Sequence, residues 1–263
     1  MDLQVNGKVA IVAASSQGLG KACAKQLVKE GVHVMISGRD SNKLEAVKEE
    51  ILSNGTGEGK IDYVQCDLTN PHDIKQLVEV TQQTFGKIDI LVNNSGGPPA
   101  GTFEQITDED WEHSFQLNLM SYVRLIRAVL ADMKKSGGRI VNIASASIKQ
   151  PIPGLLLSNT FRTGVVGLAK TLAEELGSYN ILINTVAPGK IATDRVEQLD
   201  QYTADKLNKS KEEVQKASIA TIPLNRYGTP SEFAQVVAFL ASEANTYMTG
   251  STFLIDGGMV KSI

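Results

Sequence analysis

Two side chains that could take part in chemistry stand one helical turn apart near the middle of the chain. Ser158 and Arg162 lie in the stretch LLLSNTFRTG, and the apolar residues that follow recur at the spacing of a helix with one buried face. Residues four apart project from the same side of a helix, so this hydroxyl and this guanidinium can face one ligand. The guanidinium stays charged, and its planar N–H groups suit a carbonyl oxygen or a ribose hydroxyl. An aliphatic hydroxyl is a poor acid, so the pair lacks a proton donor of ordinary strength.

A glycine-containing turn near the N-terminus is the second candidate for chemistry. The sequence AASSQGLG at residues 13–20 follows a short apolar run and opens a helical segment. Strand, turn and helix in that order place free backbone N–H groups and the positive end of a helix where a pyrophosphate could bind. Ala13 and Ala14 stand where a glycine would ease the close approach. Taken alone, the segment is equally compatible with a plain strand-to-helix turn.

The elements that would position these residues follow a regular order. Short apolar, β-branched runs such as KVAIVAA, VHVMIS, IDILVNN, RIVNIAS and ILINTVA alternate with longer stretches of helical period. This alternation is typical of a parallel sheet covered on both faces. We therefore predict an α/β fold over residues 1–263: a single Rossmann-like, doubly wound parallel sheet of about seven strands, with about six helices on its two faces.

Helix starts are well marked by capping residues. Asn70-Pro71 and Thr229-Pro230 place a cap residue before a proline at the first helical position, and Thr107 to Asp110 reads as a capping box that opens a long helix over about 108–135. The least core-like region is residues 194–226, which follow the end of a strand. We predict a substrate lid there, with a surface insertion as the alternative.

The bulk composition limits the function classes. Hydrophobic residues make up 42% and charged residues 21% of the 263, as in an ordinary globular protein, and the formal charge of -3 gives no reason to expect nucleic acid as a partner. No segment approaches the length of an apolar membrane span, and no signal peptide is recognisable, so we expect no membrane partner and a cytoplasmic location. Cys23 and Cys66 lack the spacing of a disulfide framework or a metal site, so they are expected to be reduced and packed, with no bound metal.

Several short segments, in a fixed order, carry a family resemblance. Besides AASSQGLG they are Asp67-Leu68, NNSG at 93–96, Asn118 in QLNLMS, Ser145 at the end of IVNIAS, PGKIAT at 188–193, RYGTPSE at 226–232 and Asp256-Gly257-Gly258. Over about residues 5–260 the chain resembles the short-chain dehydrogenase/reductase family, especially its members similar to 3-oxoacyl-acyl-carrier-protein reductase. The family's TGxxxGxG turn corresponds to AASSQGLG, with Ala13-Ala14 in place of Thr-Gly.

The resemblance implies a set of residues that bind a nicotinamide dinucleotide. They lie on the glycine turn, after the second and third strands, in the NNSG segment and around PGKIAT: Ala14, Ser15, Ser16, Gln17, Gly18, Leu19, Gly20, Arg39, Asp67, Leu68, Asn94, Ser95, Gly96, Pro188, Gly189, Ile191 and Thr193.

The choice between NAD and NADP is read at the end of the second strand, in VMISGRD. An acidic side chain there would bind the ribose hydroxyls of NAD, whereas an arginine pairs with the 2′-phosphate of NADP. Ser37 is taken as the residue at the family's acidic position, and Arg39 resembles the NADP-type arginine. Gln17 is neutral where strong NADP binders often carry a second basic residue. The cofactor is therefore NADP or NAD, with a slight preference for NADP.

The family's proton donor is missing. Its catalytic serine corresponds to Ser145, with Ser147 a weaker candidate, and Asn118 corresponds to its active-site asparagine. The family's tyrosine follows that serine by 13 residues and its lysine by four more, which falls on Ser158 and Arg162, so that SNTFR stands in place of YxxxK. No tyrosine occurs between Tyr122 and Tyr179, so a shifted alignment does not restore the motif. We expect an atypical active site.

Three interpretations of this site remain open. Arg162 could polarise a carbonyl while water, relayed by Ser145 or Ser158, supplies the proton; Lys149 could act as the acid; or carbonyl reduction could be lost. The leading hypothesis is an NAD(P)(H)-dependent oxidoreductase that acts on a small carbonyl or alcohol substrate, with a 3-oxoacyl thioester as one candidate, and with Asn118, Ser145, Ser158 and Arg162 at its reaction centre. The alternative is a dinucleotide-binding sensor or assembly subunit. The family resemblance implies a homotetramer or homodimer.

Overall fold

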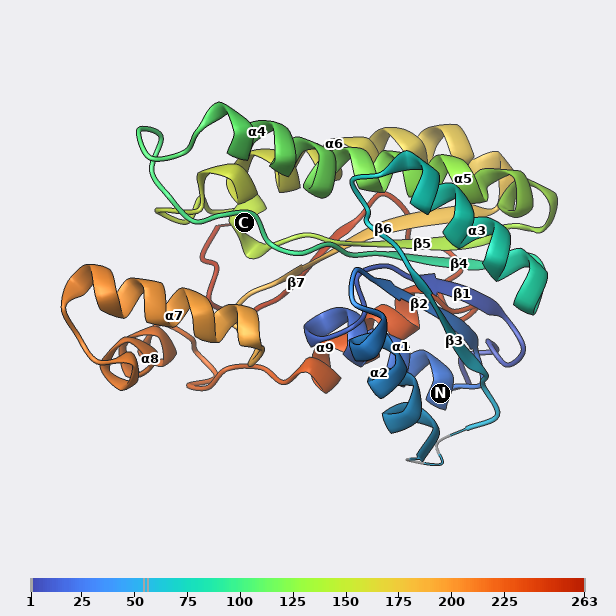
Figure 1. The fold of residues 1–263 in the computed structure, drawn as a ribbon, viewed down its shortest axis with the longest axis horizontal. Coiled ribbons are helices and arrows are strands. Elements are labelled where there is room, and N and C mark those ends of the chain that lie inside the picture. The colour runs from blue at the N-terminus through green and yellow to red at the C-terminus, as the bar shows by residue number, and fades with distance from the viewer. Residues whose placement is uncertain (1, 54, 56, 263) are drawn as a thin grey trace.

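A single parallel sheet forms the centre of the protein, as predicted. The computed structural model describes residues 2–53, 55 and 57–262, and within them the chain alternates between strands and helices (Figure 1). The sheet has seven strands in the order β3-β2-β1-β4-β5-β6-β7, and all neighbours are parallel. The strands are β1 (Val9–Val12), β2 (His33–Gly38), β3 (Ile61–Gln65), β4 (Ile90–Asn93), β5 (Gly138–Ile143), β6 (Ile181–Pro188) and β7 (Thr252–Ile255).

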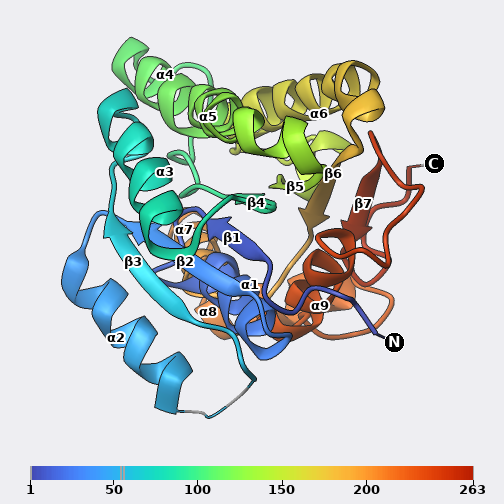
Figure 2. The ribbon, with the colours of Figure 1, turned by 90° about the vertical axis from the view of Figure 1, so that its right-hand side faces the viewer.

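Helices cover both faces of the sheet and bury it in two apolar layers (Figure 2). One face packs against α1 (Gly18–Lys29), α2 (Ser41–Ser53) and α9 (Pro230–Leu240), and the other against α3 (Pro71–Phe85), α5 (Ser121–Ser136) and α6 (Leu156–Leu176). The central strands β1, β4, β5 and β6 are buried along nearly their whole length, and most of their side chains are apolar because helices remove both faces from water. The predicted doubly wound fold is confirmed.

The predicted capping signals form as expected. The Asn70 side chain accepts a hydrogen bond from the His72 N–H at the start of α3, and Thr229 forms a capping box with Glu232 at the start of α9. Thr107 and Asp110 form a capping box that opens α4 (Asp108–Phe115). The long helix expected over 108–135 is interrupted, because residues Gln116–Met120 form a π-helical turn between α4 and α5. Such turns insert an extra residue into a helix and re-aim side chains locally.

The polar segment 194–226 contains two helices that the estimate of about six did not include. They are α7 (Asp194–Leu207) and α8 (Lys211–Ala220), which lie together beyond the carboxyl ends of the strands (Figure 1). The fully buried Asp200 fixes α7 to the rest of the chain, since its carboxylate accepts hydrogen bonds from Lys190 Nζ at 2.7 Å and Tyr227 Oη at 2.9 Å. Lys190 and Tyr227 lie just outside the two ends of the segment, so this buried carboxylate ties α7 to the residues that flank the segment.

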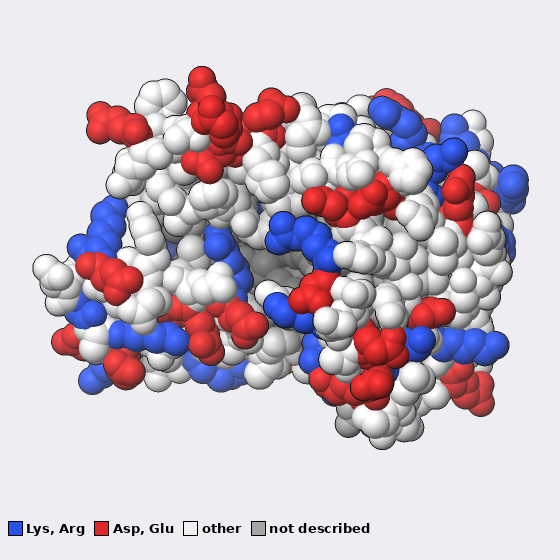
Figure 3. All heavy atoms as spheres, viewed as in Figure 1, with Lys and Arg blue, Asp and Glu red and all other residues white. Residues whose placement is uncertain are grey.

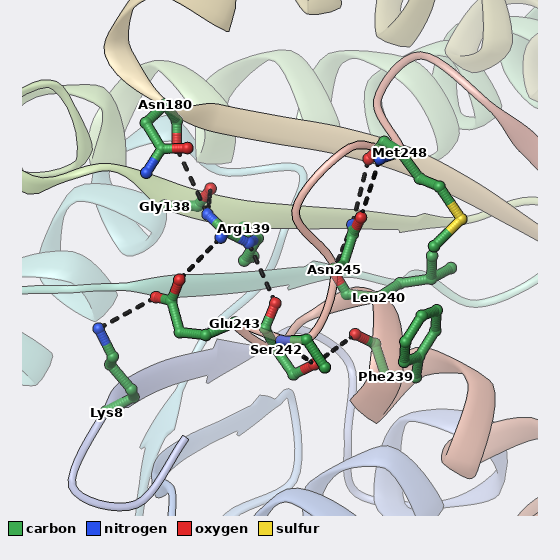
Figure 4. A network of polar contacts seen from close by, with 11 residues as sticks. Lys8, Gly138, Arg139, Asn180, Phe239, Leu240, Ser242, Glu243, Asn245 and Met248 are labelled. Atoms are coloured by element: carbon green, nitrogen blue, oxygen red, sulfur yellow. Dashed lines mark hydrogen bonds and ion pairs between the residues drawn. The ribbon is translucent and has the colours of Figure 1, made fainter. Parts of the chain in front are cut away.

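A second polar cluster joins the opposite end of the sheet to α9 (Figure 4). Arg139, at the start of β5, is 4% exposed. Its Nη2 donates to Glu243 Oε2 at 2.8 Å, and its Nε donates to the Ser242 carbonyl at 3.1 Å. Glu243 also pairs with Lys8 at 3.2 Å. This cluster lies at the amino ends of the strands, so its role is structural rather than chemical.

Cys23 and Cys66 are free and buried, and burial, together with Asp73 and Asp67, raises the pKa of the Cys66 thiol to about 12. No helix in the described part of the chain combines the length and apolar character needed to cross a membrane. Within the same residues no group of three or more His, Cys, Asp or Glu side chains is arranged to hold a metal ion.

Candidate active site

A cavity of about 840 Å³ opens at the carboxyl ends of the strands. It lies where β1 and β4 are neighbours and the strand order reverses, which is the usual ligand position in open α/β sheets. Its walls come from the glycine turn, the loops after β2, β3, β4, β5 and β6, and the first turns of α6 and α7. The space-filling view shows the molecule hollowed between its two halves, with Lys and Arg side chains on both sides of the hollow (Figure 3).

The glycine turn is shaped for an anion. Gln17 precedes α1 and makes no side-chain cap, so the first N–H groups of the helix remain available beside the cavity. Gly18 has a φ of +58°. A Cβ at Gly20 would lie 2.6 Å from the Ala14 carbonyl oxygen and 2.8 Å from Asn94 Nδ2, so only glycine lets α1 approach the strand ends this closely. Asn94 Nδ2 in turn donates to the Ala14 carbonyl at 3.0 Å.

Most of the predicted dinucleotide contacts line this cavity. They are Ala14, Ser16, Gln17, Gly18, Leu19, Arg39, Asp67, Leu68, Asn94, Ser95, Gly96, Pro188, Gly189, Ile191 and Thr193. Two predicted contacts, Ser15 and Gly20, do not line it. The fully buried Ser15 Oγ donates to the Val12 carbonyl at 2.7 Å and accepts from the Ser37 N–H at 3.0 Å, so Ser15 holds the turn in shape instead.

The end of β2 corrects one sequence interpretation. Ser37 was taken as the residue that reads the cofactor's ribose, but its side chain is fully buried and does not reach the cavity. Gly38 lines the cavity at this point, followed by Arg39, Asp40 and Lys43. The residue at the position that the sequence analysis assigned to Ser37 is therefore Gly38, which has no acidic side chain. Successive residues of a strand point to opposite faces, so an error of one residue moves the side chain to the other face.

Asp67, in the loop after β3 at the end of the cavity predicted to hold the adenosine, is held as a carboxylate. Burial alone would raise its pKa, but hydrogen bonds from the Thr69 N–H at 2.9 Å and the Thr69 hydroxyl at 2.8 Å, helped by the Arg39 charge, leave the pKa below its ordinary value. The carboxylate is thus fixed as a hydrogen-bond acceptor.

Ser145, Ser158 and Arg162 line the cavity together, at the end where the sequence predicts the reaction centre. We call this the reaction end. Ser145 follows β5, and its Oγ accepts from the Ser147 N–H at 3.2 Å. Ser158 lies in the first turn of α6 and is 8% exposed. No tyrosine lines the described part of the cavity, and the one lysine there, Lys43, lies in α2.

Arg162 is anchored inside the protein and does not turn to solvent. It is 5% exposed, and its Nη1 donates to the Tyr122 hydroxyl and to the Ile143 carbonyl at 2.9 Å. Its Nη2 donates to Ser95 Oγ at 3.2 Å and, more weakly, to the Ser95 carbonyl at 3.4 Å. All these acceptors are neutral, so the positive charge beside the cavity is not cancelled by a carboxylate.

Asn118 does not line the cavity, although it was predicted at the reaction centre. It lies fully buried in the π-helical turn, where its Nδ2 donates to Ser95 Oγ at 2.9 Å and to the Gly96 carbonyl at 2.7 Å. Asn118 and Arg162 therefore hold Ser95 from two sides. The effect of Asn118 on a ligand is through the position of the loop after β4.

The structure does not support Lys149 as the acid or Ser147 as the catalytic serine. Lys149 is exposed and lies outside the cavity, and Ser147 is buried away from it.

The sequence analysis also missed a residue. Arg195, the second residue of α7, lines the cavity, and its Nη2 donates to the Pro98 carbonyl at 2.7 Å. The only signal for Arg195 was its place two residues after Thr193, the last residue of the PGKIAT segment.

Comparisons with known proteins agree with this geometry. A family model described as enoyl-(acyl carrier protein) reductase matches residues 13–260. The chain is 37% identical over 259 residues to 3-oxoacyl-[acyl-carrier-protein] reductase of Synechocystis, and the match covers 97% of this chain and 98% of the relative. It is 34% identical over 258 residues to the 3-oxoacyl-[acyl-carrier-protein] reductase of Vibrio cholerae, and that match covers 98% of this chain and 99% of the relative. A solved structure of L-sorbose reductase from Gluconobacter frateurii, complexed with NADPH and L-sorbose, is similar with a TM-score of 0.93, 30% identity and complete coverage of both chains.

Proposed function

The chain belongs to the short-chain dehydrogenase/reductase family and is an oxidoreductase, and we propose that it transfers hydride between NADP(H) and the carbonyl or alcohol carbon of a small molecule. The observation that carries the proposal is that one cavity joins the glycine turn to Ser145, Ser158 and Arg162. Because the relatives include 3-oxoacyl reductases, 3-oxoacyl thioesters are among the substrates to test.

The residues present fit a dinucleotide phosphate. The uncapped start of α1 offers backbone donors, and Gly18 and Gly20 leave room for a close approach. Gly38 brings no acid to the ribose site, and the exposed Arg39 makes no ion pair with a described residue, so its fork is available to a 2′-phosphate. These features favour NADPH over NADH. When bound, the cofactor supplies or accepts the hydride.

The chain's own residues would stabilise the substrate oxygen without a tyrosine. The Arg162 cation is buried and fixed by its hydrogen bonds, and preorganised positive charge favours the negative charge that develops on a carbonyl oxygen during reduction. The Ser145 and Ser158 hydroxyls can donate to that oxygen and pass on a proton from water. We infer an atypical active site in which SNTFR replaces YxxxK.

Fluorescence titration with NADPH and NADH, followed by addition of acetoacetyl thioesters and simple ketones, tests the proposal. We expect NADPH to bind more tightly than NADH and to be oxidised with at least one substrate class. Arg39→Met should weaken NADPH binding and leave NADH binding nearly unchanged. Binding without oxidation across the panel would favour the sensor or assembly role, and the absence of binding would contradict both functions.

We also propose that residues 194–226 act as a substrate lid and that the chain works as a homodimer or homotetramer in the cytoplasm. Support for the lid comes from α7, which contributes Asp194, Arg195, Val196, Gln198 and Leu199 to the cavity wall. NADPH should protect this segment from limited proteolysis. Light scattering coupled to size-exclusion chromatography should give a mass of two or four chains, and a monomer would contradict the assembly.

A further inference from the structure

Two guanidinium groups face the reaction end of the cavity without a carboxylate partner. Arg162 and Arg195 both line it, and neither makes an ion pair with any residue that the structure describes. Their hydrogen-bond acceptors are carbonyl and hydroxyl oxygens. The one acidic side chain nearby in the wall, Asp194, is exposed and pairs with neither. Buried or half-buried cations usually have an anionic partner. The Arg162 and Arg195 guanidinium groups lack such a partner, and a negatively charged ligand can supply it.

The position of Arg195 is built into the backbone. A Cβ at Gly97 would lie 2.7 Å from Arg195 Nε and 2.9 Å from its Cζ and Nη2, so the guanidinium lies against the main chain of the loop after β4 in space that only glycine leaves free. Its one hydrogen bond to a described residue is the 2.7 Å bond from Nη2 to the Pro98 carbonyl. The other N–H groups of the fork are left for a ligand, and this planar arrangement matches a carboxylate.

The local electrostatics favour an anion there. Burial lowers the pKa of Arg195, and the neighbouring Arg162 cation lowers it further, so both causes act against a positive charge that no described carboxylate offsets. A carboxylate between the two would remove the mutual repulsion of the guanidinium groups.

We propose that Arg195 binds the carboxylate of an acidic carbonyl substrate, while Arg162 stands at the reacting oxygen. This proposal rests on the proposed function, because it names the substrate class for the same cavity. The phosphates of the cofactor have other places: the diphosphate at the start of α1 and the 2′-phosphate at Arg39. Arg195 contacts instead the loop after β4, at Gly97 and Pro98.

Matched pairs of acids and their methyl esters test the proposal. The probes are 2-oxopentanoate, acetoacetate and levulinate, which differ in the spacing between carbonyl and carboxylate, each compared with its methyl ester. Calorimetric binding in the presence of NADPH and kcat/KM are measured for the wild type, Arg195→Met and Arg195→Lys. Lys206→Met is the control, since it removes a cation from an exposed position of the same helix, outside the cavity.

We expect the wild type to prefer at least one acid over its ester. Arg195→Met should weaken that acid's binding and kcat/KM by about ten- to a hundredfold, the range for losing a hydrogen bond to a charged group, and change the ester by less than about threefold. Arg195→Lys should restore part of the preference, and Lys206→Met should behave as the wild type. Gly97→Ala should reproduce part of the loss, because its methyl group displaces the guanidinium.

The outcomes separate this proposal from the proposed function. Equal or better binding of every ester would overturn the carboxylate site. If Arg195→Met instead weakens NADPH binding tenfold and affects acids and esters alike, the anion at Arg195 is the cofactor's diphosphate, and the proposal is also overturned. If no probe is reduced but an acid binds through Arg195, the hydride-transfer function fails and the carboxylate site stands.

Discussion

Ala14 adopts a backbone conformation that L-residues disfavour, and two neighbouring alanines allow this to be measured. Ala14 has a φ of +46°, at the position where the family turn carries glycine, whereas Ala13 has no positive φ and its side chain is fully buried. Exchanging either residue for glycine removes the same methyl group. The left-handed conformation costs an alanine about 1–2 kcal/mol, and a glycine relieves that cost.

The two substitutions should change stability in opposite directions. Ala14→Gly relieves the strain, but it adds about 0.5–1 kcal/mol of backbone freedom to the unfolded chain and loses the contacts of a partly buried methyl group, so a net gain of about 0.5 kcal/mol is expected. Ala13→Gly adds the same freedom, relieves nothing and loses a buried methyl group worth about 0.8 kcal/mol, so it should destabilise by about 1.5 kcal/mol. The difference of about 2 kcal/mol corresponds to roughly 4 °C in Tm for 263 residues.

Differential scanning calorimetry of both variants at one scan rate measures this difference, and fluorescence titration with NADPH accompanies it. Ala14→Gly should bind NADPH at least as tightly as the wild type, because the backbone beside the start of α1 keeps its shape. If Ala14→Gly lowers the Tm as much as Ala13→Gly, the left-handed turn carries no strain and the reasoning is wrong.

Three further changes test other parts of the structure. Ser158→Tyr combined with Arg162→Lys should raise ketone reduction if the rest of the site is intact; a folded double variant without gain would show that more than the acid is missing. Arg139→Met should lower the free energy of unfolding by about 1–3 kcal/mol, because it strips donors from buried carbonyls, and leave the Kd for NADPH unchanged because the cluster lies at the other end of the sheet. The pKa of Glu232 is lowered from 4.5 to about 2, chiefly by its hydrogen bond from Arg226. Glu232 therefore stabilises the folded state above pH 4.5 and loses that contribution as the pH falls to 2. Glu232→Gln should flatten the pH dependence of the free energy of urea unfolding between these two pH values.

Much of the fold could be predicted because its signals are local. The alternation of apolar strands and amphipathic helices gave the parallel sheet, and the caps at Asn70, Thr107 and Thr229 have strong sequence preferences. The helix α8 also has a local sequence signal, the capping box of Ser210 and Glu213, although the residues around it are so polar that the segment resembles a loop.

The parts of the site that could not be predicted depend on contacts between distant segments. Arg195 is set by Gly97 and Pro98, nearly a hundred residues away. The π-helical turn that aims Asn118 has no reliable sequence signal, and the anchoring of Arg162 depends on Tyr122, in another helix. The misplaced reading position at Ser37 was an error of one residue in a strand, which periodicity alone does not resolve.

The hydrogen bonds of Arg162 affect the order in which mutations could convert Ser158 and Arg162 into the tyrosine and lysine of the family's YxxxK motif. Arg162→Lys alone would leave the Ser95 carbonyl and the Tyr122 hydroxyl without the fork that now serves both, at a cost to folding before any gain in activity. A change at Ser158 breaks no hydrogen bond to Arg162 and can come first. Stepwise mutation from the serine–arginine pair to the family motif must therefore pass through Arg162→Lys, which costs folding stability, so the pair tends to be retained.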